Sequence, residues 1–99
     1  MELGVTTTTH ADGSATVAVV GEVDTVTAGP FRAAITAAAD VHARVLVDLT
    51  RTTYLDSAGV KVLYDFVDRG VELELDGAGI LVRILTITGL DRELTVHLR

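Results

Sequence analysis

The residues best suited to chemistry lie in one run, Asp56-Ser57-Ala58-Gly59, which joins an apolar segment to a helical pattern. A serine at the start of a helix lies beside backbone N–H groups that have no partner within the helix. Its hydroxyl could simply cap the helix, because serine is an ordinary N-cap residue, with Gly59 as a packing residue. Small neighbours would also let another backbone approach the hydroxyl closely. The local pattern alone favours the capping role.

A serine nucleophile is the weaker interpretation of the same run. The nucleophile elbow of hydrolases has the form G-x-S-x-G, and Leu55 occupies the place of its first glycine. The three histidines are His10, His42 and His97, and nothing in the sequence links any of them to Ser57. A hydrolytic triad is therefore not predicted.

Two other groups of residues resemble ligand-binding sites, but neither has the spacing that such a site requires. Gly77-Ala78-Gly79 follows a strand pattern, but Val82 stands at the third glycine of a dinucleotide fingerprint, so a tight turn is predicted. The loop carboxylates lack the spacing of a calcium-binding loop, so we interpret them as solvated and predict no metal and no cofactor. These carboxylates are Glu22, Asp24, Asp48 and Asp56.

Length and composition limit the class of protein. The 99 residues are 48% hydrophobic, which suits one domain spanning residues 1–99 with a real core. Without cysteine there are no disulfides and no cysteine-based metal sites. Fourteen acidic and eight basic residues give a net charge of −6, which argues against nucleic-acid binding. With no signal-peptide pattern and no apolar run of about 20 residues, we expect a cytoplasmic protein that does not insert into membranes.

The first half of the chain predicts a hairpin and a helix. Strand patterns at residues 3–9 and 17–20 flank the turn signal Asp12-Gly13-Ser14. Residues 27–39 are rich in alanine and predict a helix, with Thr27 as its N-cap and Pro30 tolerated in its first turn.

The second half alternates strands and helices. Residues 45–49 form an apolar run typical of a strand covered on both faces, followed by a short polar loop. A helix is predicted from about 57 to 69, with Gly70 as its C′ residue, and residues 71–75 alternate as a strand does. A last strand is predicted at residues 94–98.

Residues 80–88 fit two structures. Their β-branched content allows the second strand of a hairpin, whereas Leu81, Ile84 and Leu85 also follow a helical spacing. Pattern alone leaves both open. Strands that alternate with helices predict an α/β layer fold with a mixed or largely parallel sheet.

Three separated pieces together resemble one family. They are Gly21-Glu22-Val23-Asp24, the run from Leu55 to Val60, and Thr88-Gly89-Leu90. Over nearly its full length the chain resembles a STAS domain, and more closely the bacterial anti-sigma factor antagonists. Many members carry a second serine or threonine where this chain has Ala58. The resemblance implies a mixed, mostly parallel sheet flanked by helices, with residues 80–88 as a helix whose Leu81, Ile84 and Leu85 are buried.

The resemblance also implies a function. The unphosphorylated protein would bind an anti-sigma factor that is a serine kinase, and phosphorylation of Ser57 would release it. The chain would then be a kinase substrate and not an enzyme, and a serine phosphatase could reverse the modification. Ser57 would be accessible at the first turn of its helix, with Asp24 nearby in space. The implied partner-binding residues are Glu22, Asp24, Thr25, Asp56, Ser57, Ala58, Gly59 and Val60.

Two alternatives remain within the same family. A short STAS protein can be a subunit that docks permanently on a lipid-transport ATPase without phosphorylation. A nucleotide-binding role is the other, although the sequence has no phosphate-cradling glycine loop, and Lys61 lies one turn beyond Ser57.

Overall fold

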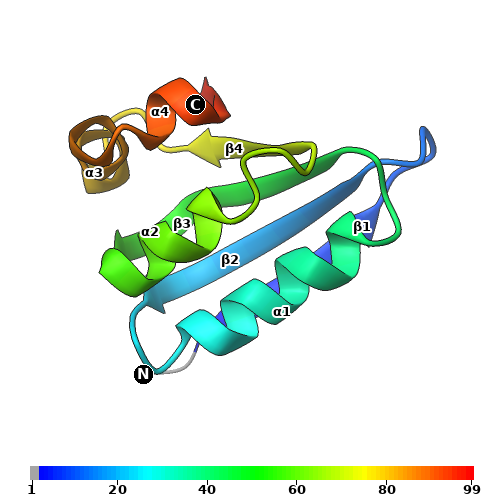
Figure 1. Ribbon diagram of the computed structural model, residues 1–99, viewed down its shortest axis with the longest axis horizontal. Helices are drawn as coiled ribbons and strands as arrows, with labels where there is room; N and C mark the ends of the chain where they lie inside the picture. The colour runs from blue at the N-terminus through cyan, green and yellow to red at the C-terminus, as the bar shows by residue number, and fades with distance from the viewer. Residues whose placement is uncertain (1–2) are drawn as a thin grey trace.

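The computed structural model describes residues 3–99 and has a five-stranded sheet whose spatial order equals its chain order (Figure 1). The strands are β1 (Gly4–Thr9), β2 (Ala15–Val23), β3 (Val45–Leu55), β4 (Val71–Leu75) and β5 (Thr95–Leu98). The helices are α1 (Ala28–Ala39), α2 (Ser57–Tyr64), α3 (Ile80–Thr88) and α4 (Leu90–Glu93). The mixed α/β fold expected from the sequence is confirmed.

All the helices cover one face of the sheet. β1 pairs with β2 in antiparallel fashion, and each later strand is parallel to the one before it. Parallel crossovers are right-handed, so three that advance in the same direction leave their helices on the same side. Residues 45–49 were predicted to be covered on both faces, and this is wrong. Val45, Val47 and Leu49 are buried under helices, whereas Leu46 and Asp48 are only half-buried.

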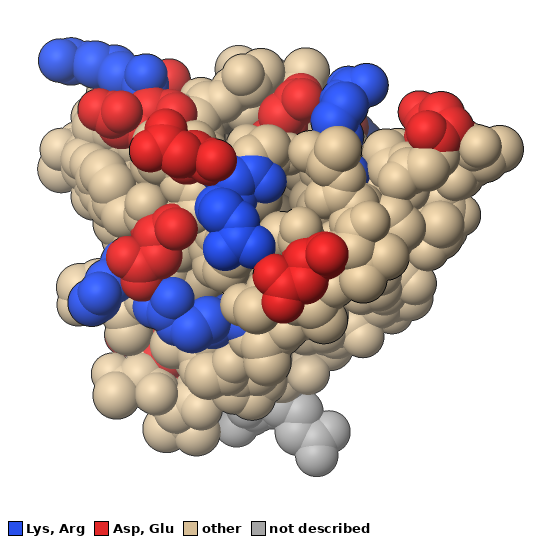
Figure 2. Space-filling model, turned by 45° about the vertical axis from the view of Figure 1, so that its right-hand side comes forward, with Lys and Arg blue, Asp and Glu red and all other residues tan. Residues whose placement is uncertain are grey.

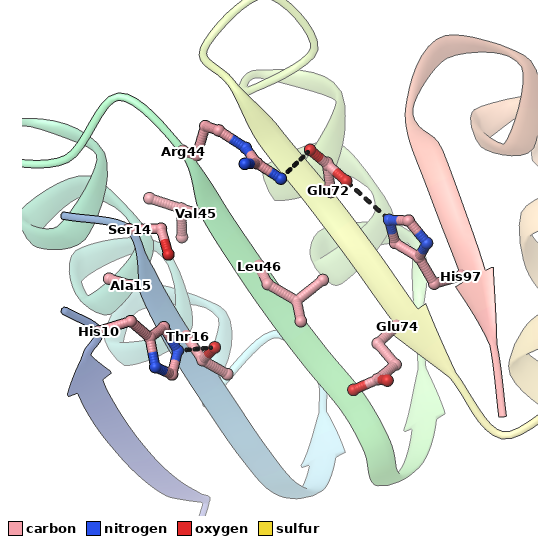
Figure 3. Close-up of a pocket in the computed structure, with 10 residues that line it drawn as sticks. All are labelled: His10, Ser14, Ala15, Thr16, Arg44, Val45, Leu46, Glu72, Glu74 and His97. Atoms are coloured by element: carbon pink, nitrogen blue, oxygen red, sulfur yellow. Dashed lines mark hydrogen bonds and ion pairs between the residues drawn. The ribbon is translucent and has the colours of Figure 1, made fainter. Parts of the chain in front are cut away.

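The uncovered face carries charged side chains over its last strands (Figure 3). Glu72 on β4 lies between Arg44 and His97, with a carboxylate oxygen 2.7 Å from His97 Nε2 and the other 3.7 Å from the Arg44 guanidinium. The Arg99 guanidinium likewise lies 3.0 Å from a carboxylate oxygen of Glu74. The contacts of His97 and Arg99 with the two glutamates add to the backbone pairing that joins β5 to β4, and Arg44 links β4 to the start of β3.

Several element boundaries differ from the sequence-based prediction. β2 continues through Gly21 to Val23, and β3 continues through the predicted polar loop to Leu55. Residues 50–53 are polar and still belong to the strand, because Thr50, Arg51 and Thr53 are not buried and the buried Thr52 hydroxyl donates to the Val19 carbonyl at 2.8 Å. The helix predicted over 57–69 ends at Tyr64, and turns lead from it to Gly70.

The core lies between the sheet and the helices. Residues 80–88 are helical, as the family resemblance implied, because Leu81 and Leu85 bury one face of α3. Ile84 was expected to be buried and is only half-buried, because α3 turns Leu81 and Leu85 toward the core. Gly77-Ala78-Gly79 forms the predicted tight turn, in which Gly79 N donates to the Asp76 carbonyl at 2.9 Å. Within residues 3–99 no helix is long and apolar enough to cross a membrane.

Candidate functional site

Two loops leave the sheet side by side at the carboxyl ends of β2 and β3. Val23 and Leu55 are paired across the two strands, and both are completely buried. Asp56 N donates to the Val23 carbonyl at 3.0 Å, so the pairing extends one residue beyond the strands. Asp24 therefore begins its loop beside the loop that carries Ser57, which is the arrangement that the family resemblance implied.

The first loop is held by the carboxylate of Asp24. Its Oδ1 accepts hydrogen bonds from Val26 N at 2.9 Å and Thr27 N at 3.0 Å, and the Thr27 hydroxyl lies 3.1 Å away. These hydrogen bonds favour the ionised form of Asp24 and hold its pKa below the usual range. The Thr27 N–H contributes most to this lowering, and the Thr27 hydroxyl and the Val26 N–H contribute less. The loop is thus organised around a carboxylate that stays charged at neutral pH.

Thr27 precedes α1 as predicted, but its side chain does not cap the helix. The hydroxyl turns back and accepts from Asp24 N at 2.9 Å, and its one proton is shared between the Glu22 carbonyl at 2.9 Å and Asp24 Oδ1 at 3.1 Å. Thr27 is buried, and its hydroxyl bonds backbone groups of the loop and none of the N–H groups at the start of α1. A sequence pattern cannot separate these two uses of one hydroxyl, since both begin with a threonine before a helix.

In the second loop, Asp56 determines where α2 begins and so sets the position of Ser57. Asp56 has extended backbone (φ −86°, ψ −171°), and its Oδ1 accepts from Ala58 N at 2.9 Å and Gly59 N at 3.1 Å. Asp56 is therefore the N-cap, and the capping role considered for Ser57 is wrong. β3 runs extended to Leu55 and positions Asp56, not Ser57, at the cap. Ser57 becomes the first helical residue, and it is exposed.

The three residues that follow Ser57 are wholly or partly buried. Gly59 is buried, and a Cβ built on it would lie 2.6 Å from Leu55 Cδ1 and 2.8 Å from Val23 Cγ1. Val60 is buried and Ala58 half-buried. These small residues let α2 approach the ends of β2 and β3 closely and so bring the two loops together.

The surface itself combines acidic, hydroxyl and apolar groups. Thr25 and Ser57 are exposed, and the side chains of Glu22, Asp24 and Asp56 are half-exposed. Val26, which follows Thr25, is 84% exposed, and Tyr54, paired with Glu22 in the sheet register, is 45% exposed. Sequence reasoning missed Val26 and Tyr54, because an apolar residue in an expected loop or strand is ordinarily assigned to the core. We call Glu22, Asp24, Thr25, Val26, Tyr54, Asp56 and Ser57 the candidate surface.

The capping geometry predicts different costs for two neighbouring alanine substitutions. Asp56→Ala removes the acceptor of two N–H groups and is expected to lower the free energy of unfolding by about 1 kcal/mol. Ser57→Ala removes an exposed hydroxyl from the first helical position and is expected to stay within about 0.5 kcal/mol of the wild type. Urea denaturation of the two variants measures both changes. Equal losses, or a larger loss for Ser57→Ala, would contradict the assignment of the cap.

The chain was compared with known families, curated proteins and solved structures. The family model described as "Mlab, STAS domain" matches residues 6–98. No curated protein matches the chain. An anti-sigma factor antagonist from Mycobacterium paratuberculosis is 29% identical with a TM-score of 0.86, covering 97% of this chain and 86% of that one.

More distant structures share the fold. The anti-sigma factor antagonist SpoIIAA in its unphosphorylated form is 15% identical with a TM-score of 0.74, over 94% of this chain and 87% of its own. The Bacillus SpoIIAA in its phosphorylated form is also 15% identical, with a TM-score of 0.68 over 94% and 90% of the two chains. With the family match covering almost all the described residues, this chain belongs to the STAS domain family, and its fold is that of the anti-sigma factor antagonists.

Proposed function

We propose that this protein is an anti-sigma factor antagonist that works by partner switching. In its unphosphorylated form it binds an anti-sigma factor that is a serine kinase, through the candidate surface. The kinase transfers phosphate from its own ATP to the Ser57 hydroxyl, and the complex dissociates. A serine phosphatase would restore the binding form. On this proposal the chain is a substrate and a regulator, not an enzyme.

The observation that carries the proposal is the placement of Ser57. Its side chain is exposed on the first residue of α2, beside the loop that Asp24 organises, so a kinase could reach it. Val26 is an exposed apolar residue on the loop that Asp24 organises, and apolar area of this kind is what a protein partner needs at the centre of a contact. Support also comes from a structure 29% identical to this chain whose protein is named an anti-sigma factor antagonist.

The capping geometry suggests how phosphate would act. The N–H groups of Ala58 and Gly59 are already bonded to Asp56, so a phosphate on Ser57 would have to displace that carboxylate to use them. Phosphate adds a charge of about −1.5 to −2 at pH 7. Next to Asp24 and Asp56 this dianion is expected to project outward, where a partner fitted to a hydroxyl would have to desolvate it. The change would act on the interface and leave the fold intact.

The test compares four forms of the protein against the partner kinase by calorimetry. Ser57→Ala is expected to bind as the wild type does and to stay bound when Mg-ATP is added. Protein phosphorylated on Ser57 is expected to bind at least tenfold more weakly. Ser57→Asp should weaken binding less, because aspartate carries one charge and two oxygens.

Thr95→Ala is the matched control, because it removes an exposed hydroxyl from the distant strand β5. It should change neither the affinity for the kinase nor the release that follows addition of Mg-ATP. If phosphorylated protein binds as tightly as unphosphorylated protein, Ser57 is not the switch. A permanent docking role, such as that of a subunit on a lipid-transport ATPase, would then replace the proposal.

A further inference from the structure

Lys61 is the one basic residue of α2, and it lies a single helical turn after Ser57. Both residues are exposed, and residues four apart on a helix share a face with their Cβ atoms about 5–6 Å apart. Each Cα–Cβ bond is tilted toward the N-terminus of its helix, so the stem of Lys61 leads back toward Ser57. The Lys61 ammonium can therefore reach a group that is attached to the Ser57 hydroxyl.

The present partner of Lys61 holds it loosely. Lys61 Nζ lies 3.6 Å from Asp65 Oδ2, and 72% of the Lys61 side chain is exposed. In this pair the base precedes the acid by four residues, which is the less favourable orientation on a helix. Asp65 is also the C-cap of α2, where the helix dipole disfavours a negative charge. Little stability is lost when Lys61 leaves Asp65.

Asp65 keeps a closer partner without Lys61. A guanidinium nitrogen of Arg32, on α1, lies 2.8 Å from the same carboxylate oxygen. The hydrogen bond from Arg32 does most to hold the pKa of Asp65 below its usual range, and Lys61 contributes less. Asp65 therefore stays ionised and paired when Lys61 turns away.

A phosphate on Ser57 would enter an acidic neighbourhood. The candidate surface holds the half-exposed carboxylates of Glu22, Asp24 and Asp56, and the N–H groups at the start of α2 already bond Asp56. On the face drawn in Figure 2, the Lys and Arg side chains lie beside Asp or Glu side chains. The phosphate must therefore draw its cation from an existing ion pair, and Lys61 is the cation within one turn of it.

We propose that phosphorylation of Ser57 makes Lys61 exchange partners, so that its ammonium leaves Asp65 and pairs with the phosphate. An anion four residues before a lysine has the favourable orientation, and a phosphate carries more charge than a carboxylate. The exchange leaves each anion with a cation, because Arg32 remains on Asp65. Phosphorylation thus adds an anion to the candidate surface and also withdraws an exposed cation beside it. This inference rests on the proposed function, since it describes the state that phosphorylation creates.

The titration of the phosphate itself tests the exchange. Phosphoserine is placed at position 57 during synthesis of the chain, so no kinase is needed, and ³¹P NMR follows the second ionisation, which ordinarily has a pKa of about 6. A cation beside the phosphate favours the dianion and lowers this pKa. Lys61→Gln is expected to raise the phosphate pKa by about 0.3–0.5 relative to the wild-type phosphoprotein. Lys61→Arg keeps the charge and should leave the pKa near the wild-type value.

Arg44→Gln is the matched control. It also removes one positive charge and one long ion pair, since the Arg44 guanidinium lies 3.7 Å from Glu72. Arg44 precedes the 11 residues of β3, whereas Ser57 follows them, so this substitution should not change the phosphate pKa. Both substituted residues are exposed, and a melting curve checks that each variant is folded.

Two outcomes overturn the exchange. They are an unchanged phosphate pKa in folded Lys61→Gln, and an equal rise in Arg44→Gln, which would show a general effect of net charge. Neither outcome bears on whether Ser57 is the switch, because that is decided by the calorimetry with the partner kinase and Mg-ATP. Conversely, a kinase that does not modify Ser57 contradicts the proposed function and leaves the measured phosphate pKa as it is.

Discussion

Gly70→Ala is expected to lower the free energy of unfolding by about 3–5 kcal/mol, a large part of the stability of a domain this size. Gly70 has φ +71°, a left-handed conformation that costs other residues about 1–2 kcal/mol. A Cβ there would also lie 2.2 Å from the Ala43 carbonyl oxygen, which is backbone and cannot turn away. Because Gly70 O accepts from Val45 N at 3.0 Å, any shift disturbs the start of β3 and β4 together.

Gly13→Ala separates the two causes. Gly13 also has positive φ (+88°), but a Cβ on it would meet nothing within 4 Å. Its substitution should therefore cost only the conformational part, about 1–2 kcal/mol. Urea denaturation with circular dichroism measures both variants. Similar losses at the two positions would show that the clash with Ala43 is relieved and that the larger figure is wrong.

Gly59→Ala is expected to destabilise the domain by about 1–3 kcal/mol, although alanine favours helices. The added methyl would overlap Leu55 and Val23, which are completely buried and lie at the ends of the two strands beneath the candidate surface. Val23 is β-branched and stiff, so the relief must come from movement of α2. The substitution should thus also disturb the position of Ser57.

Gly29→Ala is the matched control for this prediction. Gly29 lies in α1, is exposed, and has nothing within 4 Å of an added Cβ apart from its chain neighbours, so its substitution should cost less than that of Gly59, the cost being limited to the crowding that Pro30 imposes on a preceding residue with a Cβ. Thermal melts compare the two variants, and an amide NMR spectrum reports on residues 56–60. A Gly59→Ala protein as stable as Gly29→Ala would mean that the α2 packing has room for a methyl group.

Much of the fold followed from periodicity, because burial on one side of a sheet or helix leaves a pattern in the chain. The alternation in residues 71–75 and the helical spacing in 27–39 are such cases. Residues 80–88 could not be settled from pattern, since Leu81, Ile84 and Leu85 suit a helix while the β-branched content suits a strand. Packing of Leu81 and Leu85 against the sheet decides for the helix.

The candidate site was predictable in position but not in detail. The run around Ser57 stood out because an apolar strand led directly into small helix-starting residues. Either Asp56 or Ser57 could cap α2, and the choice depends on where β3 ends. The sequence did not show that β3 reaches Leu55, because its last residues include polar ones that resemble a loop. The exposure of Val26 depends on the turn that Asp24 closes, and a pattern of residue types does not show it.

The order of the strands bears on how the chain reaches its native state. Since each strand pairs with the one that precedes it in sequence, none has to be inserted between two strands already joined. Assembly can begin with the local β1–β2 hairpin and add one helix and one strand at a time. Loop-closure entropy is then lost in small steps, which favours rapid folding and suits a chain that emerges from the ribosome N-terminus first.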